Sequence, residues 1–404
     1  MLGLPVQKGE ALCLELARGI CGVTHRQVPQ SVIEYSKGRV LDTIGAAIAG
    51  SSRWEYAGRV ASGLLDIGAG SGTVIGRAER LSCGMAALMN TAFAHALELD
   101  DGHRNAGVHA GAVVVPTALA VGELVKASGR EVLTAIVLGY DVVYRLARNL
   151  NPAQIRKGFH PSATCGALGA AATAAKILGL SVEETANALG LAGLQAAGLM
   201  EATRSAQSTK CVMVGHASLV GIISAWLAAR RVPGPQTVLE GEDGLFRAMA
   251  DGVQVERVLV GFGDRFEITD TYTKLYPSCR HTHPAIEGVT FLKEEIGFGP
   301  EDVESVRVGT HRVAFNLTGS MYEPKDAGSA RFSTPYSIAI ALREGTLNLS
   351  HLEPEWLNDA GVRKLARLVK VVVDDEVDGV YPKQRGARVE VVLKDGRRFE
   401  KTVY

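Results

Sequence analysis

The sequence predicts a mainly α-helical protein with a smaller α+β domain, and three observations support this prediction. Helical patterns run from residue 5 to about residue 262 without strand-like alternation. After about residue 263, short stretches alternate apolar and polar residues, as strands do. The 404-residue chain is long for one domain and comfortable for two. We therefore expect an all-helical domain over residues 1–262 and an α+β domain over residues 263–404.

Capping signals and small residues define the helices of the first domain. Ser128 and Glu131 have capping-box spacing before an apolar helix, and Ser181 and Glu184 repeat it. Between them, CGALGAAATAAKILGL predicts a helix rich in alanine and glycine that ends near Gly179. The segment VGHASLVGIISAWLAARRV predicts another helix, which stops before the PGP triplet. The small residues allow neighbouring helices to approach closely.

Strand signals belong to the second domain. VESVRVGTH alternates with a period of two, and VKVVVDDEVD begins with a β-branched run. RVEVVLKDGRRFEKTV predicts a hairpin that turns at Asp395-Gly396. Two helical segments, HPAIEGVTFLKEEIG and TPYSIAIALREG, lie among these strands. The mixture predicts a small α+β domain.

Composition and charge narrow the class of protein. Lys+Arg and Asp+Glu both number 43, a balance that argues against nucleic acid as a partner. The six cysteines are scattered without a CxxC pair, which predicts reduced thiols and a cytoplasmic protein. The N-terminal stretch contains Glu10 and Glu15 and predicts an amphipathic helix, not a signal peptide. We see no apolar run of the ~18–20 residues that a membrane span needs, so no membrane partner is expected.

One glycine-rich segment imitates a nucleotide-binding loop. LLDIGAGSGTVIG, residues 64–76, resembles the loop with which methyltransferases bind S-adenosylmethionine. Such a loop follows a strand, and a second strand with a terminal acid comes ~20 residues later. Here the chain passes into an apolar helix instead. We therefore expect these glycines to form turns between helices.

Residues 95–111, HALELDDGHRNAGVHAG, concentrate ionisable groups between two apolar flanks. Burying a carboxylate costs several kcal/mol unless it is paired, so the cluster needs a reason. Glu98, Asp100 and Asp101 form either a polar loop between two buried helices or an acid/base site at the mouth of a helix bundle. A histidine with an ordinary pKa of ~6.5 moves protons well at neutral pH. We expect His109 to be the principal proton-transfer group, with Asp101 or Glu98 as its partner, and His103 to bind substrate.

Two further polar segments precede apolar helices. In GFHPSATCG, His160 stands before Pro161 at a predicted helix start, where hydroxyls and N–H groups favour an anion. The simpler interpretation is that His160 only caps this helix. In RSAQSTKCVMVGHA, Lys210 stands at a helix entrance, where it either binds a carboxylate in a cavity or is a solvated lysine. We expect His109 and His160 to flank one cavity.

The segment TKLYPSCRHTHPAIEG concentrates positive charge at the start of the second domain. Lys274, Arg280, His281 and His283 suit a di- or tricarboxylate, although an inter-domain ion-pair patch would have the same composition. His281 and His283 have no cysteine or carboxylate partner at zinc spacing, so we expect no metal here.

These four segments, in this order, resemble the MmgE/PrpD family, whose members include 2-methylcitrate dehydratase, cis-aconitate decarboxylase and iminodisuccinate epimerase. HALELDDGH…HAGAVVVP, GFHPSATCGALGAAATAAKILGL, the lysine before the GHA helix and KLYPSCRHTHPAI carry the resemblance, which covers residues from about 30 to 400. The resemblance implies a large helical domain with an α+β lid, an active site between them, a homodimer, and chemistry without metal or cofactor. The residues carried over by motif are Glu98, Asp100 or Asp101, His109, His160, Lys210, Lys274, His283 and Tyr336.

The resemblance implies a lyase of the 2-methylcitrate dehydratase type that acts on a small polycarboxylate. An epimerase or decarboxylase on a similar substrate is the alternative among enzymes, and a carboxylate-binding protein without turnover is the alternative of another class. Lys210 and Lys274 are expected to bind substrate carboxylates from the two domains. The sequence departs from the family pattern at Glu98 (usually Asp), Gly102 (commonly Thr) and Ala110 (usually Pro). The helical segment that commonly follows the last strand does not follow it in this sequence.

Overall fold

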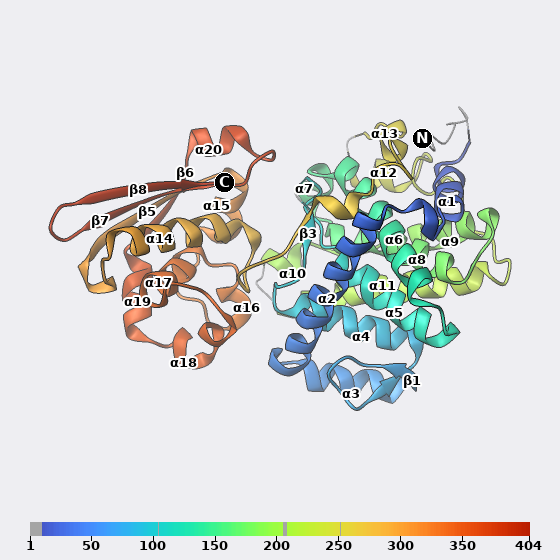
Figure 1. Cartoon of the computed structure of the whole chain (residues 1–404), viewed down its shortest axis with the longest axis horizontal. Coiled ribbons are helices and arrows are strands. Elements are labelled where there is room, and N and C mark those ends of the chain that lie inside the picture. Colours follow the sequence, from blue (N-terminus) through green and yellow to red (C-terminus); the bar gives the residue numbers. More distant parts are fainter. Residues whose placement is uncertain (1–9, 104, 205–207, 251) are drawn as a thin grey trace. The chain divides into compact units, whose positions relative to one another are not determined.

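The computed structural model describes residues 10–103, 105–204, 208–250 and 252–404, and its contacts divide the chain into two compact units. The first unit comprises Met1–Ala96, Asp100–Glu201 and Thr209–Thr273, and the second comprises Leu97–Leu99, Ala202–Ser208 and Lys274–Tyr404. Helices are the main secondary structure of the first unit, whereas the second contains a four-stranded sheet with helices (Figure 1). The predicted fold class, mainly α with a smaller α+β part, is confirmed.

The first unit is a bundle of helices of very different lengths. Its helices are α1 (Leu12–Gly22), α2 (Gln30–Arg53), α3 (Ala57–Gly68), α4 (Cys83–Ala96), α5 (Gly111–Val125), α6 (Gly129–Leu150), α7 (Ala153–Arg156), α8 (Pro161–Ile177), α9 (Val182–Leu194), α11 (Lys210–Ala228), α12 (Leu245–Met249) and α13 (Glu256–Leu259). The short helix α10 (Glu201–Arg204) lies where the chain passes between the units. The capping boxes predicted at Ser128 and Ser181 are confirmed at the starts of α6 and α9.

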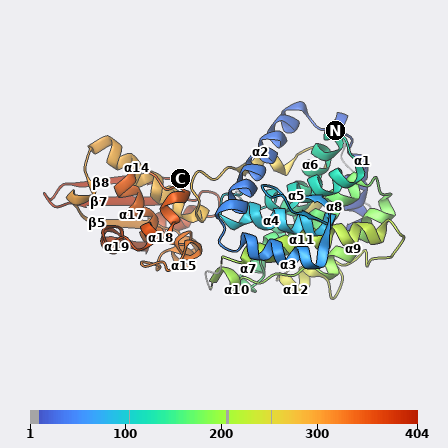
Figure 2. The same ribbon diagram turned by 90° about the horizontal axis from the view of Figure 1, so that it is seen from below.

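The centre of this unit is built from apolar helices that pack closely. Helix α8 packs against α5, α6 and α11, which lie beside it in Figure 2. A Cβ at Gly221 of α11 would lie only 2.5 Å from the main-chain nitrogen of Ala171 of α8, so the glycine permits this close approach. The small residues read from the sequence therefore serve helix packing, and α8 ends as predicted, two residues before Gly179.

Two short strand pairs in the first unit depart from the prediction of helix without strands. β1 (Ala69–Thr73) pairs antiparallel with β2 (Arg80–Leu81), and β3 (Gly102–His103) pairs antiparallel with β4 (Thr271–Tyr272). The glycine-rich segment forms the end of α3 and the strand β1, not merely a turn. Because β1 pairs antiparallel with a neighbouring strand, it does not form the parallel βαβ unit of a methyltransferase, in agreement with the sequence interpretation.

Helix α11 corrects the expectation that no segment is long enough to cross a membrane. Among the described residues, this one helix is long and apolar enough by length and composition, and 61% of its most apolar window is buried. It packs against α4, α5, α8 and α9 within the first unit. These contacts are those of a core helix, whose apolar surface is covered by protein.

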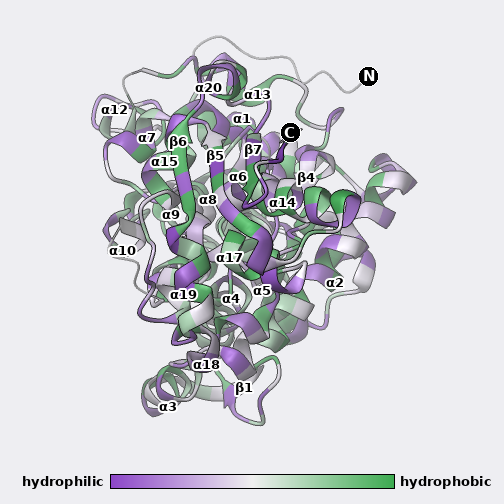
Figure 3. Cartoon of the chain, turned by 90° about the vertical axis from the view of Figure 1, so that its left-hand side faces the viewer, coloured by the Kyte–Doolittle hydropathy of each residue, from purple (hydrophilic) through white to green (hydrophobic). Residues whose placement is uncertain are grey.

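The second unit is built around a mixed sheet in the order β6-β5-β7-β8. β5 (Val303–Thr310) pairs parallel with β6 (Val369–Val373) and antiparallel with β7 (Ala387–Leu393), which forms the predicted hairpin with β8 (Arg398–Val403). Along β7, buried residues alternate with partly buried ones, and the colour of this strand changes between hydrophobic and hydrophilic in Figure 3. The helices are α14 (His283–Ile296), α15 (Arg312–Thr318), α16 (Ala327–Ala330), α17 (Thr334–Glu344), α18 (Pro354–Leu357), α19 (Ala360–Arg367) and α20 (Asp375–Val380), and α14 packs against β7, β8 and α17.

Candidate active site

Three histidine rings from separate parts of the sequence gather in the first unit. His95 is in the last turn of α4, His109 lies two residues before α5, and His160 is the N-cap residue of α8. The ring centroid of His95 lies 5.3 Å from that of His109 and 6.1 Å from that of His160. His109 and His160 therefore both lie close to the His95 ring, and that they flank one cavity stays a prediction.

Asp100 supplies the negative charge of this cluster. Its Oδ2 lies 2.6 Å from Nδ1 of His95 and 3.6 Å from Nδ1 of His109. The side chains of Asp100 and His95 are fully buried, whereas that of His109 is 20% exposed. A carboxylate in this position fixes the orientation of the imidazoles beside it. We call His95, Asp100, His109 and His160 the histidine cluster.

The hydrogen bonds of His109 define its tautomer. Nδ1 lies 2.6 Å from the main-chain oxygen of Asp101, and a carbonyl oxygen only accepts, so Nδ1 carries a proton. Proton exchange at this residue is thereby assigned to Nε2. The main-chain nitrogen of His109 donates to the hydroxyl of Ser162 in the first turn of α8, at 3.1 Å. This bond ties the segment before α5 to α8.

The partner expected for His109 differs from the one found. The Asp101 carboxylate accepts from the Tyr140 hydroxyl at 2.7 Å and from the main-chain nitrogen of Gly111 at 3.0 Å. Burial raises the pKa of Asp101 to about 7, partly opposed by the hydrogen bond from Tyr140. Asp101 therefore holds His109 through its main-chain oxygen, and the carboxylate beside the ring belongs to Asp100.

His160 is not a simple helix cap, because its side chain makes no capping hydrogen bond at the start of α8. It is 6% exposed and lies against His95. The first turn of α8 also carries the buried hydroxyls of Ser162 and Thr164. The interpretation of His160 as part of a polar site at this helix start agrees better with these contacts than the capping interpretation does.

Lys210 is the first residue of α11 and is 9% exposed, which rules out the solvated lysine that the sequence left open. A buried ammonium is costly unless a negative group balances it. Three neighbouring positions that the sequence analysis grouped with this lysine, residues 205–207, lie outside the described residues.

In the second unit, Lys274 forms a buried ion pair with Glu98, with 2.9 Å between Nζ and Oε2. Glu98 has a φ of 55°, in the left-handed region that few residues other than glycine adopt. Such backbone strain is common at functional sites, where the surrounding structure maintains it. That this pair and the histidine cluster serve one substrate stays a prediction.

The remaining residues of the basic segment carry less positive charge than the sequence indicated. His283 is buried, and its Nε2 donates to the main-chain oxygen of Ser278 at 3.3 Å. Burial, together with Arg280 and Lys274, lowers the pKa of His283 well below its ordinary value. Burial, with Arg385 as the next cause, does the same for the pKa of His281. Both imidazoles are therefore neutral, and the positive charge of the segment belongs to Lys274 and Arg280.

Tyr336, carried over as a substrate-binding residue, is a core residue of the second unit. It is 1% exposed, and its hydroxyl donates to the main-chain oxygen of His351 at 2.6 Å. The hydroxyl proton is thereby used within the protein. Burial raises the pKa of this phenol above its ordinary value, so it stays neutral.

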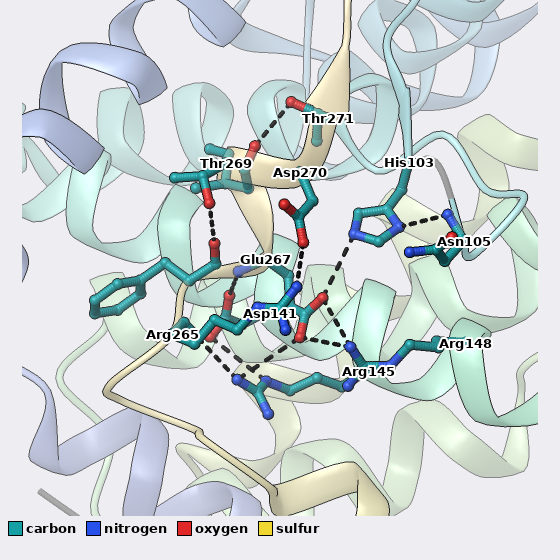
Figure 4. A network of polar contacts seen from close by, with 12 residues as sticks. His103, Asn105, Asp141, Arg145, Arg148, Arg265, Glu267, Thr269, Asp270 and Thr271 are labelled. Atoms are coloured by element: carbon teal, nitrogen blue, oxygen red, sulfur yellow. Dashed lines mark hydrogen bonds and ion pairs between the residues drawn. The ribbon is translucent and has the colours of Figure 1, made fainter. Parts of the chain in front are cut away.

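His103 belongs to a different polar network from the histidine cluster (Figure 4). Its Nε2 lies 3.4 Å from Glu267, which Arg148 contacts at 3.0 Å and Arg145 at 3.9 Å. Burial opposes ionisation of Glu267, but His103 and the two arginines hold its pKa below the ordinary value. His103 is 1% exposed, and its ring lies 4.3 Å from that of Tyr144. The network therefore stabilises β3, and it leaves little of the His103 ring for contact with a substrate.

This network also has the spacing of a possible metal site. Ligand-type atoms of His103, Glu267 and Asp270 lie within 4.8 Å of one another. However, Arg265 contacts Asp270 at 2.5 Å, and Arg148 contacts Glu267. Guanidinium groups already balance both carboxylates, and their charge disfavours a dication. We interpret the three residues as part of an ion-pair network.

Gly102 has a structural reason for departing from the threonine common in the family. It pairs with Tyr272, and a Cβ at position 102 would lie 2.4 Å from the Tyr272 hydroxyl oxygen. Any larger residue would force this tyrosine to move. The side chain of Tyr272 thus occupies the space that a threonine side chain would need.

Two residues of the site, His95 and Tyr140, received no predicted role from the sequence. His95 begins the segment of ionisable residues that the sequence shows, and it lies in the last turn of α4, five residues before Asp100. Tyr140 is buried in α6 and binds Asp101, but nothing in its local sequence distinguishes it from a core residue.

The chain belongs to the MmgE/PrpD family. The model of the MmgE/PrpD N-terminal domain matches residues 14–258, and that of the C-terminal domain matches residues 276–404. Together these matches cover most of the chain, and they agree with the family resemblance of the four motifs.

Curated relatives with similar sequences are decarboxylases by name. A cis-aconitate decarboxylase-like protein, oryM, of Aspergillus oryzae is 27% identical over 96% of this chain and 85% of its own length. The cis-aconitate decarboxylase of Aspergillus terreus is 27% identical over 93% of this chain and 81% of its own length. The cis-aconitate decarboxylase of Homo sapiens is 28% identical over 95% of this chain and 81% of its own length. These relatives support an enzyme with decarboxylase- or dehydratase-like activity.

Proposed function

We propose that the protein is a lyase that acts on a small di- or tricarboxylate by proton transfer at a carbon next to a carboxylate, without a cofactor. The observation that carries this proposal is the histidine cluster, in which His95 and His109 lie beside the buried Asp100 carboxylate and His160 lies against His95. His109 is the partly exposed member, and its Nε2 is the nitrogen assigned to proton exchange. Such a group supplies general acid–base catalysis near neutral pH.

Buried lysines support a substrate with several carboxylates. Lys210 begins α11, and Lys274 is held by Glu98. Each charge-assisted hydrogen bond to a substrate carboxylate is worth roughly 1.5–3 kcal/mol. We propose that both lysines bind substrate, and that Arg280 contributes the remaining positive charge of the basic segment.

The reaction itself is one of three that share this chemistry. Dehydration expels hydroxide from the neighbouring carbon, decarboxylation expels CO₂, and epimerisation returns the proton to the other face. The names of the curated relatives favour decarboxylation of a substrate like cis-aconitate. We therefore place decarboxylation first, with dehydration of a citrate-like substrate as the other lyase reaction to test.

One experiment distinguishes these reactions. The full chain is incubated in D₂O with cis-aconitate, 2-methylcitrate, citrate, malate and aspartate-derived dicarboxylates, and proton NMR follows each mixture. Decarboxylation of cis-aconitate releases CO₂ and leaves an allylic carbanion that takes one deuterium at either end, dehydration of a hydroxy acid forms a vinyl signal without release of CO₂, and epimerisation exchanges an α-proton without a net loss. His109→Asn should abolish the signal change, whereas the exposed His216→Asn should not.

A different result would remove the proposal. If calorimetry shows that one of these carboxylates binds while neither product nor deuterium exchange appears with any of them, the protein is a carboxylate-binding protein without turnover. We also expect a homodimer, which light scattering of the purified protein tests.

A further inference from the structure

His95 is the buried centre of the histidine cluster and has no role in the proposed reaction so far. Its side chain has no exposure, and its Nδ1 lies 2.6 Å from Oδ2 of Asp100. The same oxygen lies 3.6 Å from Nδ1 of His109, and the two rings are 5.3 Å apart. One carboxylate thus lies beside two imidazoles.

Both imidazoles present the same nitrogen to this carboxylate. Nδ1 of His109 donates to the Asp101 main-chain oxygen, and Nδ1 of His95 donates to the ionised Asp100. In each ring the additional proton of the charged form is therefore on Nε2. Nε2 of His95 is buried and has no hydrogen-bond partner among the described residues. An unsatisfied buried nitrogen is costly, so natural proteins retain one where it has a purpose.

Charge balance limits how many of these rings are protonated together. One imidazolium neutralises the single charge of Asp100. A second, about 5 Å away in a buried place, would be repelled by the first without a further counter-charge. Groups that interact so strongly titrate as a pair and not independently.

We propose that His95 is a positioning residue that acts through Asp100 on His109, and that the two imidazoles share one additional proton. While His95 is neutral, the Asp100 charge is available to stabilise protonated His109. When His95 takes the proton, His109 is held in its neutral, basic form. The inference deepens the proposed function and rests on it for its catalytic meaning, but the coupling itself is a property of the free protein.

Other charged and titratable groups lie on the elements around this pair. His160 is the third ring in contact with His95. Of the helices packed against α4, α2 carries Arg39, which contacts Asp42, and α11 begins with Lys210. Glu123 of α5 hydrogen-bonds Thr73 at the protein surface. The buried carboxylate of Asp101, the next residue in the chain, interacts electrostatically with Asp100 and with Arg39 and is held by Tyr140 and Gly111.

The test follows the titration of His109 by NMR in full-length protein with ¹³C-labelled histidine. In the wild type, the His109 signal should titrate in two steps separated by more than about one pH unit, as coupled sites do. His95→Asn keeps an N–H that can donate to Asp100 but removes the titrating nitrogen. In this variant the His109 signal should titrate in a single step. The exposed His216→Asn serves as the control and should leave two steps.

Activity gives a second, separate measurement once a substrate is known. His95→Asn should lower kcat about tenfold or more while KM changes less than about twofold, since a positioning residue acts on the transition state and not on binding. A single-step titration of wild-type His109, or two unchanged steps in His95→Asn, would overturn the inference. Coupled titration in a protein that converts none of the tested carboxylates would leave the coupling intact and contradict only the proposed lyase.

A second variant covers the case in which His95→Asn does not fold. Asp100→Asn removes the shared negative charge and keeps the size of the side chain. Both titration steps of His109 should then move to lower pH, because the charged imidazole loses its counter-ion. If the His109 titration is the same in Asp100→Asn as in the wild type, Asp100 does not couple the two rings and the inference is wrong.

Discussion

The protein contains two groups of buried or partly buried histidines in opposite electrostatic surroundings. In the first unit, His95 and His109 lie beside the Asp100 carboxylate. In the second unit, Nε2 of His311 lies 3.2 Å from Nδ1 of His281, and the His311 ring stacks on Tyr381 with 4.1 Å between centroids. Burial and then Arg385 lower the pKa of His311 to about 4.

The difference shows that the neighbouring charge decides what a buried histidine does. Nδ1 of His311 accepts from the main-chain nitrogen of Ala314, so Nε2 carries the proton and donates to His281. Both rings of this pair are neutral hydrogen-bonding groups that hold the start of α15. The first group has the carboxylate of Asp100 beside it, where the second has the cation of Arg385, and this suits the first group to proton transfer. The following predictions test this contrast.

The largest effect is expected for His109→Ala. Loss of general acid–base catalysis should lower kcat by about 10²-fold or more, while the protein stays folded. Initial rates with the substrate found in the NMR panel, and circular dichroism as a folding control, measure this. Turnover close to that of the wild type would assign the proton transfer to another group.

Lys274→Ala should lower kcat/KM by about ten- to a hundred-fold, the equivalent of one lost charge-assisted contact. The change also leaves Glu98 buried without its partner, which destabilises the fold. The double variant Lys274→Ala/Glu98→Gln should recover thermal stability without recovering kcat/KM. Unchanged kinetics in Lys274→Ala would show that this lysine does not contact substrate.

His311→Asn should change how stability depends on pH. The depressed pKa means that unfolded His311 binds a proton between pH ~6.5 and about 4 whereas folded His311 does not, so stability falls as pH falls through this window. The asparagine keeps an oxygen that can cap α15. On acidification the variant should lose about 2 kcal/mol less free energy of unfolding than the wild type, a value discounted for solvent screening. Urea unfolding at pH 6.5 and 4.5 compares the two proteins. An equal loss in both would mean that His311 is not the group that stays neutral.

Asp101→Asn should have the smallest effect, with kcat reduced less than about tenfold, because its side chain supports the loop and does not touch the His109 ring. Asn retains an oxygen that can accept from Gly111. Rates measured beside those of His109→Ala give the comparison. If Asp101→Asn abolishes turnover while His109→Ala retains it, the carboxylate is the base and the assignments are reversed.

Features with local causes were predictable from the sequence. The capping boxes at Ser128 and Ser181 and the hairpin at Asp395-Gly396 depend on residues a few positions apart, and the structure has all three. The two-residue strands β3 and β4 were not predictable, because such short pairs carry no periodic signal and join distant parts of the chain.

The same division holds for the site. The acidic segment and His109 were visible as a charge cluster between apolar flanks, but which of two adjacent aspartates faces the ring depends on distant contacts. Tyr140 of α6 holds the Asp101 side chain, and this leaves Asp100 beside His95. The neutral state of His283 was equally hidden, because burial and neighbouring cations are properties of the folded chain.

The pairing of β3 with β4 has a consequence for biosynthesis. Gly102 and His103 follow the two aspartates directly, and their strand partners are Tyr272 and Thr271. The acidic loop therefore lacks its pairing strand until the ribosome has made more than half of the chain. Contacts between such distant residues form late and slowly. Nascent chains that end before residue 271 should accordingly bury the helices early yet leave this loop accessible to protease, long after α4 and α5 have packed.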